Sequence, residues 1–242
     1  MAVAVEAASL PAVNWNGSQA VFFSDNDGPF TLGFRFRADS DLKITALGAF
    51  DYLGDGLATT HIVGIWPTNG GAPLATVTIP SGTNAPLLGA FRYATVSNVM
   101  LSAHTEYIIG ASDFYGEDAD IYPYDPQGFS TAPGVTFLRA RESSDELTGG
   151  LLFPDDEYNP GSPLAVNFQF VSVSRLVIQR EGSTGVELSW TTNAPGFHPE
   201  YAESLASTVW NTVTNVPTVI GDNFVVPLPN TGVQRYFRLR SP

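Results

Sequence analysis

Carboxylate side chains gather in one short stretch of the chain, where they could bind a cation. Five acidic residues fall between positions 113 and 125: Asp113, Glu117, Asp118, Asp120 and Asp125. Calcium takes about six to eight oxygen ligands in flexible geometry, and a loop rich in carboxylates can supply them. The spacing is not that of an EF-hand, because the glycine and the final glutamate of that loop are not in place. Two interpretations stay open: a calcium site made by these five residues, or a solvated acidic loop that keeps the protein soluble.

Tyrosine side chains are interleaved with these acids. Tyr115, Tyr122 and Tyr124 lie in the same stretch, and Tyr158 follows in the next acidic segment. A tyrosine ring stacks on a sugar or an apolar group, while neighbouring carboxylates accept hydrogen bonds from hydroxyl groups. These four residues are therefore predicted to bind a glycan or a peptide. The alternative is that the rings only anchor a long loop onto the body of its domain.

Recognisable catalytic motifs are missing from the sequence. The three histidines, His61, His104 and His198, are scattered, and there is no H-E-x-x-H pair, G-x-S-x-G elbow or G-x-x-x-x-G-K-[ST] loop. The chain has no cysteine, which excludes disulfides and thiolate metal sites. We therefore predict a non-catalytic protein without a cofactor, apart from the calcium considered above. His61 precedes an apolar run and is interpreted as a histidine of a strand end or of the core.

Alternation of apolar and polar residues with a period of two governs most of the chain. In Phe30–Arg37 the side chains of Phe30, Leu32, Phe34 and Phe36 share one face, which is typical of a half-buried strand. No segment carries an apolar stripe of helical period, and turn-forming residues separate the runs. Further strands are predicted at 43–50, 61–66, 73–79, 89–96, 106–111, 135–141, 165–171, 175–179, 186–190, 199–203, 208–213, 223–228 and 234–240.

This pattern predicts an all-β protein made of two tandem antiparallel β-sandwich domains. A larger, jelly-roll-like domain is expected over 15–171, preceded by an N-terminal arm at 1–14. Within it the regular spacing loosens over 112–163, the acidic and tyrosine-rich region, and irregular stretches of such length are often functional. A small immunoglobulin- or fibronectin-like domain is expected over 172–242, where six or seven short strands follow one another.

The distribution of charge argues against one class of partner. Residues 1–171 contain 19 acidic and 6 basic side chains, whereas residues 172–242 contain 5 of each, so the net charge of −13 lies on the first part. An acidic surface repels phosphate backbones, and nucleic acid is therefore not an expected partner. The chain has no continuous apolar run of about 18 residues, so no membrane span is expected.

Several segments of the first part resemble a known family. They are residues 44–66 (ITALGAFDYLGDGLATTHIVGIW), 71–83 (GAPLATVTIPSGT), 89–96 (GAFRYATV) and 106–111 (EYIIGA). Together they are similar to an uncharacterised β domain of secreted bacterial proteins, often ones with PEP-CTERM sorting tails. The resemblance implies a β fold and export from the cell, and it implies no catalytic residues.

The last part of the chain resembles a second family. Residues 186–197 (VELSWTTNAPGF), 210–213 (WNTV) and 235–242 (RYFRLRSP) are similar to a small fibronectin-like module at the C-termini of exported bacterial proteins. This resemblance implies an extracellular or cell-surface location. Met1–Leu10 lacks the basic start and continuous apolar segment of a secretory signal, so the export signal is expected to be missing from this form of the chain.

Three functions are compatible with these features. The first is a non-catalytic adhesion or binding module at the cell surface, with a glycan or a protein as its partner. The second is a structural subunit that self-associates into a filament or surface layer. In that case the alternating N-terminal segment Ala2–Ala8 would add a strand to the sheet of a neighbouring copy. The third is a cryptic hydrolase or a hydrolase accessory domain, whose activity would depend on His61 or His104.

Overall fold

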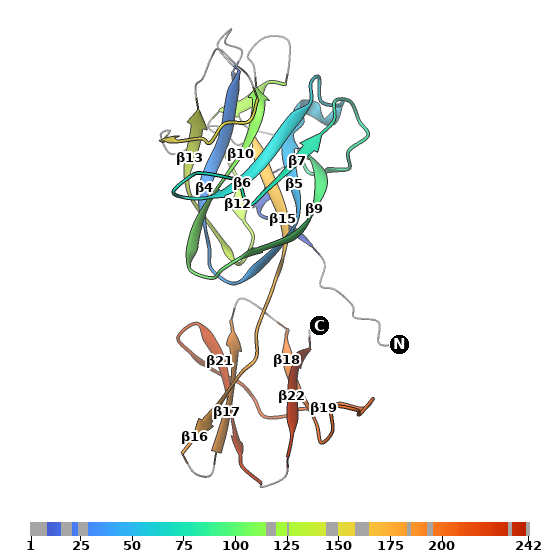
Figure 1. Ribbon diagram of the computed structural model, residues 1–242, viewed down its shortest axis with the longest axis vertical. Helices are drawn as coiled ribbons and strands as arrows, with labels where there is room; N and C mark the ends of the chain where they lie inside the picture. Colours follow the sequence, from blue (N-terminus) through green and yellow to red (C-terminus); the bar gives the residue numbers. More distant parts are fainter. Residues whose placement is uncertain are drawn as a thin grey trace. The chain divides into compact units, whose positions relative to one another are not determined.

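β-Strands make up nearly all the regular structure in the computed structural model, and the predicted all-β sandwich fold is confirmed. The described residues group into two compact units, Ser9–Val171 and Ser172–Pro242 (Figure 1). No helix among them is long and apolar enough to cross a membrane. The structure describes residues 9–15, 21–23, 29–114, 120–124, 126–143, 150–157, 165–182, 185–192, 196–231 and 234–240.

Two antiparallel sheets form the sandwich of the first unit (Figure 1). The sheet of order β1-β15-β5-β9-β8 consists of β1 (Leu10–Pro11), β15 (Val166–Ser172), β5 (Leu42–Phe50), β9 (Phe91–Leu101) and β8 (Leu87–Leu88). The sheet of order β14-β13-β4-β10-β6-β7 consists of β14 (Asp156–Glu157), β13 (Val135–Ser143), β4 (Phe30–Ala38), β10 (Thr105–Phe114), β6 (His61–Pro67) and β7 (Ala75–Ile79). Shorter elements are the pair β11 (Tyr122–Tyr124) and β3 (Val21–Phe23), the pair β12 (Ser130–Thr131) and β2 (Val13–Asn14), and the 3₁₀ turn η1 (Tyr52–Gly54).

The core of the first unit lies between its two sheets. Phe34 and Phe36 of β4 have no exposed surface, and Phe36 packs on Phe168 of β15 with 4.7 Å between ring centroids. Arg35, between them in sequence, points to the other face, where it pairs with Glu106 of β10. The alternation seen in the sequence is therefore the alternation of the two faces of β4. Each fully buried phenylalanine stabilises the fold by roughly 2–3 kcal/mol.

A row of glycines brings a chain segment close to the outer face of the larger sheet. Gly110 of β10 is the register partner of both Gly33 on β4 and Gly64 on β6. A Cβ atom on Gly64 would lie 2.9 Å from the side chain of Leu151, and one on Gly110 would lie 3.1 Å from Pro154. The absence of side chains along this row is what allows the segment after β13 to pack there.

The second unit is a smaller sandwich of two sheets (Figure 1). The sheet of order β16-β17-β21-β20 consists of β16 (Val177–Glu181), β17 (Gly185–Thr191), β21 (Asn223–Pro229) and β20 (Thr218–Ile220). The sheet of order β19-β18-β22 consists of β19 (Asn211–Thr212), β18 (His198–Ala202) and β22 (Tyr236–Arg240). Leu188, Trp190, Val213 and Val226 form the buried cluster between the two sheets.

Candidate functional site

The five acidic residues predicted to bind calcium fall into two groups. Asp113 and Asp120 are described by the structure, whereas Glu117, Asp118 and Asp125 lie outside the described residues. Among the described residues, no three acidic or histidine side chains come together in a way that could hold a metal ion. A calcium site in this region would therefore need residues outside the described ones, and calcium binding stays a prediction.

Asp120 directs its carboxylate into the protein. Its Oδ1 accepts a hydrogen bond from the backbone N–H of Ala58 (2.8 Å), and its Oδ2 accepts one from the N–H of Thr59 (3.0 Å). Burial by itself raises the pKa of this carboxyl group, but hydrogen bonds from His61, Thr59 and Ala58 outweigh burial, so the pKa of Asp120 is lower than its ordinary value. Asp120 is thus an ionised group that ties its own segment to the residues before β6.

His61 is completely buried and lies between Asp120 and Ser112. Its Nδ1 lies 2.6 Å from the carbonyl oxygen of Ser112, and its Nε2 lies 2.8 Å from Oδ2 of Asp120. Each ring nitrogen thus faces an oxygen that can accept a hydrogen bond, and the ring joins the Asp120 carboxylate to the backbone of β10. Phe114 stacks on the ring, with 4.4 Å between the centroids.

This cluster contains the three residue types of a hydrolytic triad but not their arrangement. In a triad the serine hydroxyl donates to the histidine ring and faces the substrate. Here Ser112 presents its carbonyl oxygen to His61, while its hydroxyl accepts from the N–H of Ile62 and donates to Asp113. Neither Ser112 nor His61 has exposed surface. The geometry therefore joins β6, β10 and the segment before β11, and it offers no nucleophile to a substrate.

Asp113 also uses its carboxylate within the protein. Its φ of 62° lies in the left-handed region, at the irregular register between Ala111 and Phe114 of β10. Besides the hydroxyl of Ser112, it accepts a hydrogen bond from the backbone N–H of Gly150 at 2.8 Å. Asp113 therefore holds the start of the segment that packs on the glycine row.

Only one of the four tyrosines predicted to bind a glycan or a peptide has a described side chain. Tyr122 is 8% exposed, and its ring packs edge-on against Phe30 with 6.3 Å between centroids. Tyr124 is described in its backbone alone, as the end of β11, and Tyr115 and Tyr158 lie outside the described residues. Tyr122 thus contributes to packing, and glycan binding by this region stays a prediction.

Among the residues that the structure describes, the second unit has a strand edge without a neighbour. The order β16-β17-β21-β20 facing β19-β18-β22 corresponds to the strands A, B, E and D of an immunoglobulin-type sandwich facing C′, C and F. In such a sandwich a further strand, G, pairs with F on the side away from C. β22 takes the place of F, and within the described part of the chain it pairs with β18 alone.

The inner face of β16 is uncovered at the same place. Ile178 is the register partner of the fully buried Leu188, so its side chain points between the sheets, and yet it is 51% exposed. The other four residues of β16 are also exposed. In an immunoglobulin-type sandwich strand G lies opposite strand A, and no strand among the described residues covers Ile178 at that position.

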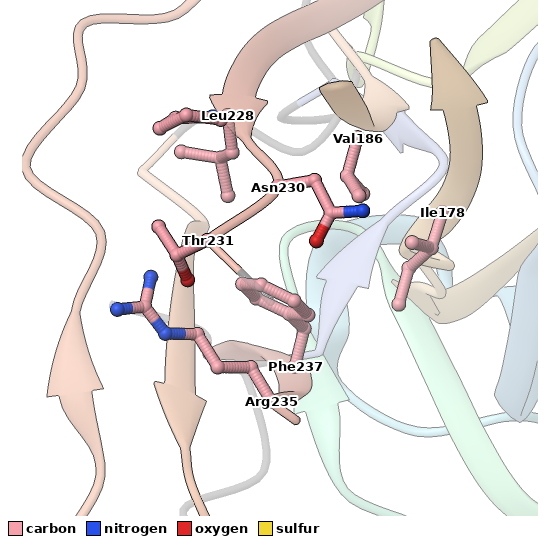
Figure 2. Close-up of a pocket in the computed structure, with 8 residues that line it drawn as sticks. Ile178, Val186, Leu228, Asn230, Thr231, Arg235 and Phe237 are labelled. Atoms are coloured by element: carbon pink, nitrogen blue, oxygen red, sulfur yellow. The ribbon is translucent and has the colours of Figure 1, made fainter. Parts of the chain in front are cut away.

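A pocket of about 190 Å³ opens between the two sheets at this edge. In the view of Figure 2 the Phe237 ring lies between Ile178 and Val186 on one side and Thr231 and Arg235 on the other. Five of the eight lining residues are apolar, and the three polar ones lie in the connection between β21 and β22. The lining residues are Ile178, Val186, Leu228, Pro229, Asn230, Thr231, Arg235 and Phe237.

Arg235 is the charged group of the pocket. Its guanidinium carbon lies 4.6 Å from the centroid of the Tyr201 ring. Its Nε is buried and has no hydrogen-bond partner among the residues that the structure describes. A buried donor left without an acceptor costs about 1–3 kcal/mol. An oxygen supplied by a bound molecule would remove this cost, so the pocket favours a ligand with both an apolar part and an acceptor.

The pocket could not be recognised from the sequence. Ile178 and Phe237 lie in predicted strands and have the alternation of ordinary core residues. What makes them part of a site is that β22 has one neighbour among the described strands, and this depends on how distant strands are ordered in the sheets.

Comparisons with protein families, with characterised proteins and with solved structures find no match for this chain.

Proposed function

We propose that this protein is a non-catalytic binding protein of the extracellular or cell-surface type, an adhesion module that recognises protein. Its binding site is the open edge of the second unit, and its ligand is an extended polypeptide segment that pairs with β22. The observation that carries the proposal is that, in the described part of the chain, an unpaired edge, an uncovered inner face and an apolar pocket coincide at one place in the sandwich.

The open edge supports the mode of binding. An edge strand presents a row of backbone N–H and C=O groups that can form a ladder with an added strand. The inward side chains of β22 are Phe237 and Leu239, which pack on the core cluster, and Phe237 also lines the pocket. Main-chain hydrogen bonds would supply affinity without regard to sequence, and the pocket would select the side chain placed in it.

The pocket supports the chemistry of that side chain. A strand added beside β22 turns every second residue toward the gap between the sheets. A cavity of roughly 150 Å³ lined by aliphatic groups accommodates a ring the size of benzene, so about 190 Å³ accommodates a branched aliphatic side chain such as valine or leucine. Arg235 adds an N–H donor that suits a carbonyl or carboxylate oxygen next to that side chain.

The environment of the histidines supports the absence of catalysis. His61 is buried with both ring nitrogens bonded, and His104 lies in the turn between β9 and β10 with a φ of 56°. His198, at the start of β18, lies 3.9 Å from a buried Glu200 that already binds Arg238 and Arg240. A location outside the cell is supported by the resemblance of both parts of the chain to exported modules.

The proposal is tested by titrating the full chain with four kinds of blocked heptapeptide. Every second residue is valine in the first kind, alanine in the second, serine in the third and aspartate in the fourth. Amide chemical shifts measured by NMR should change along β22 and β16 with the valine peptides only. Ile178→Glu, which places a charge at the mouth of the pocket, should weaken binding at least tenfold. Val219→Glu is the matched control, because Val219 is 59% exposed on β20 at another edge of the same sheet. Binding that survives Ile178→Glu, or shifts confined to other strands, would contradict the proposal.

A further inference from the structure

We infer that the polypeptide bound at the open edge is the free C-terminal end of a partner chain. Its last residue, a branched aliphatic one, enters the pocket, and its terminal carboxylate pairs with Arg235. This inference rests on the proposed function, since it states which part of a polypeptide the edge of β22 selects. It follows from the direction of β22, from the position of the pocket along this strand, and from two arginines that have no carboxylate partner among the described residues.

The direction of β22 determines which end of an added strand reaches the pocket. β22 runs from Tyr236 to Arg240, and the pocket adjoins its beginning, since Arg235 and Phe237 line the pocket and Leu239 does not. Within the described part of the second unit, every strand pair is antiparallel. A strand added antiparallel to β22 starts beside Arg240 and ends beside Tyr236. Its C-terminal end is therefore the end that reaches the pocket.

Two arginines lie at this end of the open edge. Arg235 lines the pocket itself. Arg180 is exposed near the end of β16 and is the register partner of Val186, another lining residue, so both side chains are on the inward face of the sheet. The acids next to them in sequence, Glu181 and Glu187, are turned to the opposite face by the alternation of the strands. The pocket end of the edge is therefore positively charged.

Neither of these arginines has a carboxylate partner among the residues that the structure describes. Farther along β22, Arg238 and Arg240 are both bound to Glu200. Arg235 instead has the Tyr201 ring 4.6 Å from its guanidinium carbon, and its buried Nε has no acceptor. Contact with an aromatic face holds a guanidinium in place, and a guanidinium donates two parallel hydrogen bonds to a carboxylate. The group that complements Arg235 is thus a carboxylate.

The spacing of an extended chain places a terminal carboxylate next to this arginine. The residue of the added strand opposite Phe237 turns its side chain to the inward face, where the pocket is. Its own carboxylate lies about 3.4 Å farther along, in the direction of Arg235. In the view of Figure 2 the Arg235 side chain lies beside the Phe237 ring. An internal residue would offer only a neutral carbonyl oxygen at this point, so the charge of Arg235 distinguishes a chain end from a continuing chain.

Peptides that differ only in their C-terminal groups test the inference. Three acetylated peptides have valine at every second residue of a heptapeptide that ends in valine. The first keeps its free C-terminal carboxylate, and the second ends in an amide. The third is extended by serine and aspartate and then amidated, so that it offers a side-chain carboxylate instead. Titrated into the full chain, the free acid should bind about tenfold more tightly than either amide, as expected for a charge-assisted hydrogen bond.

Arginine variants identify the group that reads the carboxylate. Arg235→Gln should reduce the ratio of the free-acid affinity to the amide affinity to about one, since the charged donor is lost. Arg180→Gln should reduce this ratio only about twofold, because Arg180 is exposed. Arg175→Gln is the matched control, since Arg175 is exposed, precedes β16 and does not line the pocket, and it should leave the ratio unchanged. A variant with a damaged fold would lose affinity for both peptides and would leave the ratio in place.

A nitroxide label on the N-terminus of the free-acid peptide tests its direction. It should broaden the amide signals of Leu239 and Arg240 more than that of Tyr236. Equal affinities for free acid and amide, tightest binding of the aspartate peptide, an unchanged ratio in Arg235→Gln, or broadening centred on Tyr236 would each overturn the inference. If the blocked valine peptides still bind β22 in these cases, the proposed function stands and only the preference for a C-terminus is wrong. If none of the peptides binds, the proposed function is wrong as well.

Discussion

Several charged residues of the first unit are buried and serve to connect segments that are distant in sequence. His61 and Asp120 form one such pair, and Asp51 and Arg92 form another, with 2.6 Å between Oδ2 and Nε. Arg92 additionally donates to the carbonyl oxygens of residues 54, 83 and 85, so one guanidinium connects the turn after β5 with the loop between β7 and β8. Buried carboxylates need hydrogen-bond partners, and Asp51 and Asp120 both have them.

The lowered pKa of Asp120 predicts how the first unit responds to acid. Because the folded-state pKa lies below the unfolded value of about 3.9, the stabilisation is fully present above that value and is lost as the pH falls through the folded-state pKa. Asp120→Asn should lower the melting temperature at pH 7 and flatten its dependence on pH between about 5 and 2. Asp120→Ala should cost on the order of 3 kcal/mol, because it leaves the buried ring of His61 and the N–H groups of Ala58 and Thr59 without their acceptor.

Melting curves of wild type and Asp120→Asn, recorded from pH 7 to pH 2, measure this effect. Asp55→Asn is the matched control, since Asp55 is exposed and its substitution should leave the wild-type profile in place. Parallel profiles for wild type and Asp120→Asn would show that the carboxylate is not the group that responds to acid.

The roles of these residues could be predicted from the sequence only in part. His61 was interpreted as a strand-end or core histidine, and it is buried as the first residue of β6. Asp120 was assigned to a calcium loop or a solvated loop because it lies among other acids, and sequence composition gives no sign that it faces inward. Its partner His61 is 59 residues away, and such a pair becomes visible only when the order of β6 and β10 in the sheet is known.

At the scale of elements, the strands of nine or more residues in the first unit were the most predictable. The alternation in β4 and β5 identifies each strand to within a residue or two, since each buries one face along its whole length. In the second unit a strand was predicted over 208–213, but only Asn211–Thr212 pairs as β19, and β20 was not predicted. Strands of two or three residues are set by the neighbours they meet rather than by their own pattern.

The glycine row predicts an order of sensitivity within the larger sheet. A Cβ on Gly33 would lie 1.9 Å from the backbone carbonyl oxygen of Ile109, and this atom cannot move without distorting the strand pair. A Cβ on Gly110 would be 3.0 Å from a methyl group of Thr31 and 3.1 Å from Pro154, which can shift slightly. We therefore expect Gly33→Ala to cost about 3 kcal/mol or more and Gly110→Ala to cost about 1 kcal/mol.

Urea denaturation of the two alanine variants measures this difference. Gly71→Ala provides a third comparison, because no atom lies within 4 Å of its Cβ position, and its cost comes only from a φ of 87°. If Gly33→Ala and Gly110→Ala lower the free energy of unfolding equally, the close approach of β4 to β10 does not determine the cost of adding a side chain there.

At the scale of the whole molecule, the two units differ in how much core they possess. Among the described residues, the cluster of the first unit includes Phe34, Phe36, Phe50, Phe91 and Phe168, together with many aliphatic side chains. The cluster of the second unit consists of four buried residues, and one of its sheets ends in the open edge of β22. Since stability rises with buried apolar area, the second unit is expected to be the weaker of the two.

Calorimetry should therefore show two unfolding transitions, with the second unit melting first. Leu188→Ala removes a fully buried side chain of that unit and should lower only the first transition, at a cost of about 2–4 kcal/mol. Phe34→Ala should lower only the second transition. A valine heptapeptide that binds the open edge stabilises the folded form of one unit alone, so saturation should raise the first midpoint and leave the other unchanged. A single transition that moves with both substitutions would mean that the two units unfold together. The expectation that the second unit unfolds first would then be wrong.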